Sequence, residues 1–306
     1  RPHSRIKTIG NGRIFLNGAD AIWTNEGVVH LHSFDSLRVA SELANQCGKI
    51  KFYGETGYTF LGDHSVLQID GSPIAAVELI LAEDAKRGAE GSGTCKLNHV
   101  NLHFHNNAEW HVGVKSRYNE VNANGYTPHH KLSFHNRMRW QGGTLQDMEI
   151  KASNGGIAGA ILQNLVGLWC KAQFSNTGIR LNHCDFDHTS VQCENIEPHS
   201  WVAHCSFLDG WTDLPQLEVS ESQSTLFLEE NRFENHDIGL RLFHAQSTAS
   251  CNAWEGNDTG VVLDTLSRLD AKSPYGKNEW IENGIHIQCH SAYMPLFQSG
   301  ANQFGD

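Results

Sequence analysis

The sequence has no uninterrupted apolar run that approaches the ~20 residues required by a membrane-spanning helix. Charged residues are also scarce, at 19% of the 306-residue chain, and the 34 acids outnumber the 23 bases. The net charge of −11 disfavours a nucleic-acid partner, because phosphate backbones are bound through clustered Lys and Arg. Fourteen Phe, eight Trp and six Tyr are too many for a disordered chain. We therefore expect a folded protein with no membrane span and no nucleic-acid partner.

Cysteine pairs of the CxxC type are missing, which excludes the dense metal clusters of zinc-ribbon proteins. Eight cysteines are also too few for a fold of this length that is held together by disulfides. We expect most of them to be buried as small hydrophobic side chains. One or two disulfides remain open if the protein is exported.

The chain also lacks an initiator Met and an apolar leader, and it stops inside a repeat. We expect a processed chain that is secreted or held at the cell surface. It would then be part of a longer exported protein or of a surface complex.

A repeated phrase is the strongest pattern in the sequence. Four C-terminal segments share Asn-x-aromatic, and two earlier segments have Cys in place of the Asn. Successive aromatics are 21, 26, 21, 26 and 24 residues apart. A turn with Asn and Gly, and then a short apolar strand, follows several of them. These aromatics are Phe186, Phe207, Phe233, Trp254, Trp280 and Phe304.

A period of 21 to 26 residues predicts a solenoid whose rungs stack on one another. Leucine-rich repeats have a similar period, but their Leu-x-x-Leu-x-Leu phrase is missing, and propeller blades are longer, at roughly 40 to 50 residues. Alternation with a period of two, as in Gly178-Ile-Arg-Leu181, excludes a helical repeat. We therefore predict an all-β fold, a right-handed parallel β-helix. Its aromatics should form one buried column, with Asn ladders at the bends.

This rung pattern resembles the right-handed parallel β-helix superfamily, the pectin-lyase-like fold, most clearly over residues 157–306. The resemblance concerns the fold and implies little about activity, since the two separate readily. Pectate lyases of this fold use acidic calcium ligands with a basic residue, and the hydrolases use clustered aspartates. The sequence has no Asn-Thr-Asp phrase and no Asp-Asp pair, so these signatures are absent.

The N-terminal third predicts a cap and the first rungs. Residues 35–46 have an apolar helical face and should form a helix that covers the end of the solenoid. Residues 106–130 should form a long loop, and such loops on rigid scaffolds often carry binding sites. We divide the chain into residues 1–92, with the cap and first rungs, and residues 93–306, with further rungs, as one continuous domain.

One predicted strand carries the best local group of reactive residues. If Cys184 and Phe186 point inward, then His183, Asp185 and Asp187 point outward, and they are our predicted catalytic residues if the protein is an enzyme. Carboxylates about 4.8 Å apart on successive rungs could hold a calcium ion or act as an acid–base pair. The simpler interpretation, which we favour, is a solvated acidic face. We expect no cofactor other than this possible calcium ion.

His103 and His105 form a His-x-His pair, which places both rings on one side of a strand. No third ligand can be assigned, so no metal site is predicted. Together with Trp110 and Trp211, these histidines are our predicted glycan-binding residues, because indole rings stack on sugars and imidazoles bind hydroxyls.

Two functions remain open at this stage. The first is a structural, adhesive or glycan-binding surface protein whose partner is a polysaccharide or a cell-surface glycan. The second is a polysaccharide lyase or glycoside hydrolase that acts in a groove on the β-helix. Converging carboxylates, or a carboxylate beside a Lys, Arg or His, would favour the enzyme.

Overall fold

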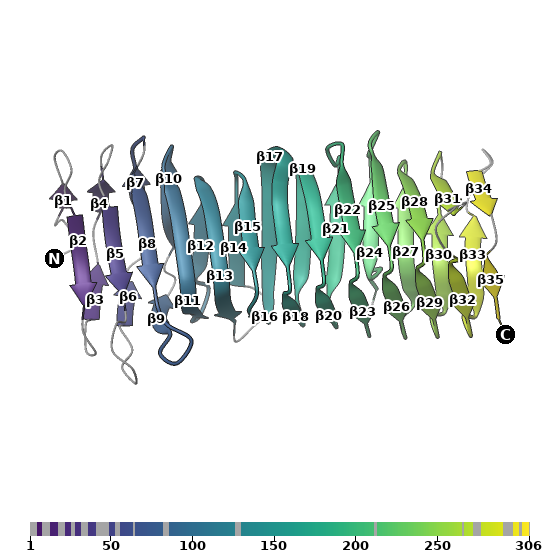
Figure 1. Cartoon of the computed structure of the whole chain (residues 1–306), viewed down its shortest axis with the longest axis horizontal. Helices are drawn as coiled ribbons and strands as arrows, with labels where there is room; N and C mark the ends of the chain where they lie inside the picture. The colour runs from purple at the N-terminus through teal and green to yellow at the C-terminus, as the bar shows by residue number, and fades with distance from the viewer. Residues whose placement is uncertain are drawn as a thin grey trace. The chain divides into compact units, whose positions relative to one another are not determined.

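The computed structural model describes residues 5–7, 13–17, 22–25, 28–31, 36–40, 49–52, 56–63, 65–81, 86–125, 130–210, 213–264, 266–271, 277–289, 296–299 and 302–305. The regular secondary structure of these residues consists of strands of 2 to 16 residues, and every strand pairing given by register is parallel. Among them there is no helix that is long and apolar enough to cross a bilayer. The chain divides into two compact units, residues 1–151 and residues 152–306, each with its own stacks of strands (Figure 1).

Three parallel stacks build the first unit. The long strands β11 and β13 each bend and contribute to two stacks, and His99, with a left-handed φ of 48°, marks the bend in β11. One stack contains β1 (Arg5–Lys7), β4 (Val28–Leu31), β7 (Thr56–Leu61), β10 (Lys86–Gly91), β12 (Glu109–Val112) and β14 (His130–Phe134). The next contains β2 (Arg13–Asn17), β5 (Ser36–Ala40), β8 (Val66–Asp70), β11 (Thr94–Phe104), β13 (Lys115–Asn124) and β15 (Met138–Gln141). The third contains β3 (Ile22–Asn25), β6 (Lys49–Phe52), β9 (Val77–Leu81), the later halves of β11 and β13, and β16 (Thr144–Gln146).

The second unit repeats this plan, and β17 (Met148–Gln163) contains the boundary between the units. One stack contains β18 (Val166–Leu168), β20 (Asp185–Asp187), β23 (Ser206–Leu208), β26 (Arg232–Glu234), β29 (Ala253–Glu255), β32 (Glu279–Ile281) and β35 (Gln303–Phe304). The next contains β19 (Lys171–Asn182), β21 (Ser190–Glu194), β24 (Leu217–Ser220), β27 (Ile238–Phe243), β30 (Thr259–Leu263) and β33 (Ile285–Cys289). The third contains the end of β19, β22 (Ser200–Ala203), β25 (Thr225–Glu229), β28 (Gln246–Ser250), β31 (Arg268–Ala271) and β34 (Leu296–Ser299).

The predicted aromatic column is confirmed in the second unit. Each of its six rings is in register with the next, and neighbouring ring centroids are 4.8–5.4 Å apart. From Phe207 onward the rings are nearly parallel, with interplanar angles of 4–13°. Five rings are fully buried, whereas Phe304 stacks on Trp280 and is 49% exposed.

The predicted Asn ladder is also present, at the bend before this column. The side-chain amide of Asn231 donates to Oδ1 of Asn252, Asn252 donates to Asn278, and Asn278 donates to Asn302, at 2.9–3.2 Å. The main-chain N–H groups of the first three donate to the same oxygens. Each buried Asn thus satisfies backbone groups that the bend takes out of the strand pairing.

The predicted helix over residues 35–46 is wrong where the structure describes it. Residues 36–40 form β5, which pairs in parallel with β2 and β8, while residues 41–48 lie outside the described residues. Leu37 and Val39 satisfy a period of two as well as a helical face. They are in register with Leu67 and Ile69, which are buried in β8. Pairing with two neighbouring strands therefore decides the conformation.

The predicted long loop over residues 106–130 is also wrong. This segment contains the strands β12 and β13, joined by the short turn at residues 113–114, and residues 126–129 lie outside the described residues. Asn and charged side chains made the segment look like a loop, but they occupy outward positions that alternate with buried Val112, Tyr118 and Val121. The division between residues 92 and 93 stays a prediction.

Seven cysteines fall in the described part of the chain, and all seven are free thiols. Five of them are buried, as expected of small hydrophobic side chains. Burial raises the pKa of the Cys95 thiol to about 12, so this thiol stays protonated at neutral pH.

Candidate functional site

Three successive rungs of the first unit share the phrase basic–hydrophobic–amide. The phrases are Lys96-Leu-Asn98, Arg117-Tyr-Asn119 and Arg139-Trp-Gln141, and they are 21 and 22 residues apart. In each strand the middle residue is buried, which turns the residues on either side of it outward.

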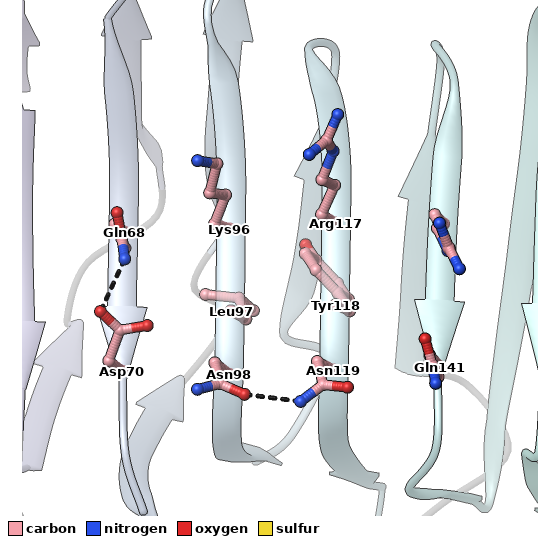
Figure 2. Close-up of a pocket in the computed structure, with 10 residues that line it drawn as sticks. Gln68, Asp70, Lys96, Leu97, Asn98, Arg117, Tyr118, Asn119 and Gln141 are labelled. Atoms are coloured by element: carbon pink, nitrogen blue, oxygen red, sulfur yellow. Dashed lines mark hydrogen bonds between the residues drawn. The ribbon is translucent and has the colours of Figure 1, made fainter.

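Register then brings like residues together on the outer face of β8, β11, β13 and β15. Lys96 is paired with Arg117, and Arg117 with Arg139, and we call these three residues the cationic row. Asn98, Asn119 and Gln141 form a parallel amide row in the same way. Figure 2 shows Lys96 and Arg117 of the cationic row beside the amide row, with Asn119 Nδ2 donating to Asn98 Oδ1 at 2.7 Å. Neighbouring members of a row are about one strand spacing, 4.8 Å, apart.

The two rows line an open pocket of about 340 Å³. Gln68 and Asp70 of β8 close one end, where Gln68 Nε2 donates to Asp70 Oδ2 at 2.7 Å (Figure 2). Buried Leu97 and Tyr118 lie beneath the rows and form its floor. The volume is at the small end of ligand sites, and eight of the ten lining side chains are polar. Such a pocket suits a hydrophilic ligand that lies along the surface.

The cationic row has no carboxylate partner in the described part of the chain. Five other Lys and Arg side chains of the described surface do have one: Lys86 with Glu109, Lys151 with Glu149, Arg232 with Glu255, Arg241 with Asp264 and Arg268 with Asp270, at 3.0–4.0 Å. Like charges directly opposite one another on neighbouring strands are destabilising. An anionic ligand would remove this repulsion.

His103, a predicted binding residue, lies around the bend of β11 and forms a short hydrogen bond with a carboxylate. Its Nε2 contacts Oε2 of Glu78, and both side chains are about a quarter exposed. Glu78 Oε1 accepts a bond from Asn101, and Asn101 accepts one from Asn122, at 2.7 and 2.9 Å. The ladder holds the carboxylate, which in turn orients the imidazole. His105 is half-buried just beyond the end of β11, and no metal-ligand cluster of the described residues includes either histidine.

Two of the three residues predicted as catalytic, Asp185 and Asp187, lie on β20, whereas His183 lies at the bend between β19 and β20. Cys184 and Phe186 are buried, His183 and Asp185 are exposed, and Asp187 is half-buried. His183 has a left-handed φ of 52°, and its ring stacks on His204 with centroids 4.7 Å apart. Their catalytic role stays a prediction.

The predicted calcium column contains acids that already have partners. Asp187, Leu208, Glu234 and Glu255 are in register, but Glu234 and Glu255 both pair with Arg232. Asp187 instead lies beside His188 and Asp209, with one ligand atom of each within 4.8 Å of the others. Calcium prefers an all-oxygen shell of six to eight ligands, of which the two carboxylates of this cluster supply a part, so a calcium ion here stays a prediction.

The exposure of each tryptophan shows whether its ring packs inside the protein or can contact a ligand. Trp110 is 1% exposed and its indole N–H donates to Tyr118 Oη at 2.9 Å, so the prediction that it stacks on a glycan is wrong. It occupies an inward position of β12, where packing takes the whole ring. Trp211 lies outside the described residues. Trp169 and Trp201, by contrast, are 45% and 46% exposed.

The cationic and amide rows were not predicted from the sequence. The signal that could have found them is the basic-x-amide phrase, repeated at the same spacing as the rungs in residues 96–141. It was hidden because the Asn-x-aromatic repeat starts only in the second unit.

No family model matches the chain, and no curated protein matches its sequence. Among solved structures, the A-module of the mannuronan C-5 epimerase AlgE6 from Azotobacter vinelandii is similar. The similarity covers 92% of this chain and 89% of that one, with 13% identity and a TM-score of 0.37. This level of similarity supports no inference about activity. From its own strand pairing, the chain is an all-β protein of the parallel β-helix type.

Proposed function

We propose that the outer face of β8, β11, β13 and β15 binds an acidic polysaccharide. The observation that carries this proposal is the cationic row, three Lys and Arg side chains in register with no carboxylate partner among the described residues. The cations repeat from strand to strand along the stack, and the acidic groups of a polysaccharide repeat from sugar to sugar along its chain. Carboxylate or sulfate groups on successive sugars would therefore face successive cations. Guanidinium groups bind such anions with two parallel hydrogen bonds.

The amide row supports a glycan as the carrier of these anions. Amide side chains offer both donors and acceptors to sugar hydroxyls. A net charge of −11 argues against nucleic acid, which would be repelled outside this one face. Acidic polysaccharides are largely extracellular polymers, so we also propose that the protein acts outside the cell.

Replacement of the whole cationic row should weaken binding to a polygalacturonate oligomer. For the variant K96Q/R117Q/R139Q we expect Kd to rise by about threefold to a hundredfold, because three exposed charge contacts of roughly 0.2–1 kcal/mol each are lost. Binding by the wild type should weaken as salt approaches 1 M, where the Debye length is about 3 Å. Isothermal titration calorimetry measures both effects.

The matched control is K86Q/K131Q/K151Q, which changes the net charge equally at positions outside the row. It should bind like the wild type. Equal loss of binding in both triple variants would show that the net charge of the protein, and not the cationic row, determines the affinity. Single-stranded RNA binding as tightly as the polyuronate would also contradict the proposal.

A glycan-modifying enzyme is the second candidate, and the Glu78–His103 pair favours it. A carboxylate that holds one imidazole nitrogen leaves the other free to move a proton, as in other acid–base pairs. If this candidate is right, H103Q should abolish release of reducing ends or unsaturated products from polygalacturonate without changing Kd. Loss of turnover in D185N/D187N, with H103Q active, would instead favour the residues predicted from sequence.

A further inference from the structure

Two exposed aromatic side chains lie next to each other on the second unit. Trp201 of β22 is 46% exposed and Phe227 of β25 is 47% exposed, and the two residues are in direct register. Parallel pairing therefore places their attachment points about 4.8 Å apart along one outer face. We call them the aromatic pair.

Polar side chains continue this line on both sides. Arg180 of β19 precedes Trp201 in register, with its guanidinium carbon 5.3 Å from the indole centroid. Thr248 and then Asp270 follow Phe227. Arg180 restrains the indole by a cation–π contact. The line thus presents two apolar rings between hydrogen-bonding groups.

The exposed apolar area of the aromatic pair indicates whether a protein or a small ligand would bind there. Two half-exposed rings offer about 200 Å², given that a Phe or Trp side chain buries roughly 150–250 Å². A stable protein–protein interface needs about 800 Å² from each partner. The pair is therefore too small to hold a second copy of the chain, but it matches the apolar faces of one or two sugar rings.

The charges around the pair decide between acidic and neutral sugars. The charged residues around the pair are of both signs: Arg180, exposed Glu229 two residues after Phe227, and Asp270, which lies 3.7 Å from Arg268. This face consequently has no excess of cations, unlike the cationic row of the first unit. A polyanion would gain nothing here.

We propose that the aromatic pair is a second binding site, for a neutral polysaccharide with flat pyranose rings. The C–H faces of β-linked pyranoses stack on Trp201 and Phe227, and the ring hydroxyls bond with Thr248 and Arg180. This site does not depend on the cationic row, so either can exist without the other.

The test uses cellohexaose as the probe, with the full chain and titration calorimetry. W201A/F227A should raise Kd for cellohexaose at least fivefold while its thermal melting stays close to that of the wild type. W201F, which keeps a ring, should retain most of the affinity. W169A removes an equally exposed indole elsewhere in the same unit and should bind like the wild type.

The two binding proposals can fail independently. K96Q/R117Q/R139Q should bind cellohexaose normally, and W201A/F227A should bind polygalacturonate normally. No cellohexaose binding by the wild type, or unchanged binding by W201A/F227A, overturns the aromatic site. A change of sedimentation coefficient on removing the pair would show self-association and would also overturn it.

Discussion

At the scale of single residues, buried Asn side chains replace the backbone pairing that is lost at the bends before Phe233, Trp254 and Trp280. Asn252 alone donates to the carbonyls of Leu228 and Ser250 and accepts from the backbone and side chain of Asn231. In two earlier rungs Cys184 and Cys205 hold this position, and the N–H of Cys205 donates to Asn231. The ladder is thus specified by side chains that each serve several backbone groups.

Asn252→Ala should lower the free energy of unfolding by about 2–5 kcal/mol, because at least two buried polar groups lose their partners at roughly 1–3 kcal/mol each. Asn119→Ala, which breaks an exposed amide–amide bond, should cost only about 0.5 kcal/mol. Denaturant titration of both variants measures the difference. Similar costs would show that the ladder adds nothing beyond an ordinary hydrogen bond.

At the scale of elements, the aromatic column of the second unit is held in place both by the pairing of its strands and by the stacking of its rings. Trp254 is fully buried and has a ring on each side, Phe233 at 5.4 Å and Trp280 at 4.8 Å. Since the strands are in register, each ring is held by the backbone of its own rung. A deleted ring therefore leaves a cavity that the neighbouring rings cannot fill without shifting their strands.

Trp254→Ala should destabilise the protein by about 3–5 kcal/mol, the usual cost of a buried Trp with its residual cavity. Trp201→Ala removes an indole that is nearly half exposed and should cost less than about 1 kcal/mol. Calorimetric melting of both variants gives the comparison. If Trp254→Ala melted like the wild type, the stacking of the aromatic column would not contribute to the stability of the protein.

At the scale of the whole molecule, charge is distributed unevenly over an acidic surface. The net charge is −11, yet one face carries the cationic row, while Lys86, Arg232 and Arg241 elsewhere are paired with carboxylates. Repeating rungs amplify any outward residue that recurs at the rung spacing into a line of like groups. A solenoid can therefore build a linear binding surface from a three-residue phrase.

The sequence by itself was sufficient to predict the rungs, the aromatic column and the Asn ladder. Inward and outward positions follow from alternation, and spacings of 21–26 residues determine which residues meet on neighbouring rungs. These features are local or periodic, because the same sequence phrase and the same alternation of inward and outward residues recur in successive rungs. The outward orientation of Asp185 followed from the same rule.

Some choices cannot be made from a local sequence pattern: whether a segment forms a helix or a strand, and which side of a strand faces inward. Only the tertiary structure decided these. Leu37 and Val39 fit a helix or a strand, and pairing of β5 with two neighbouring strands selected the strand. Trp110 and Trp201 are both aromatic residues in polar surroundings, but one lies on the inward side of its strand and the other on the outward side. The cationic row depends on turn lengths that put three cations in register. Strand pairing is a long-range interaction between rungs, so its outcome is set by the neighbours of a segment and not by the segment alone.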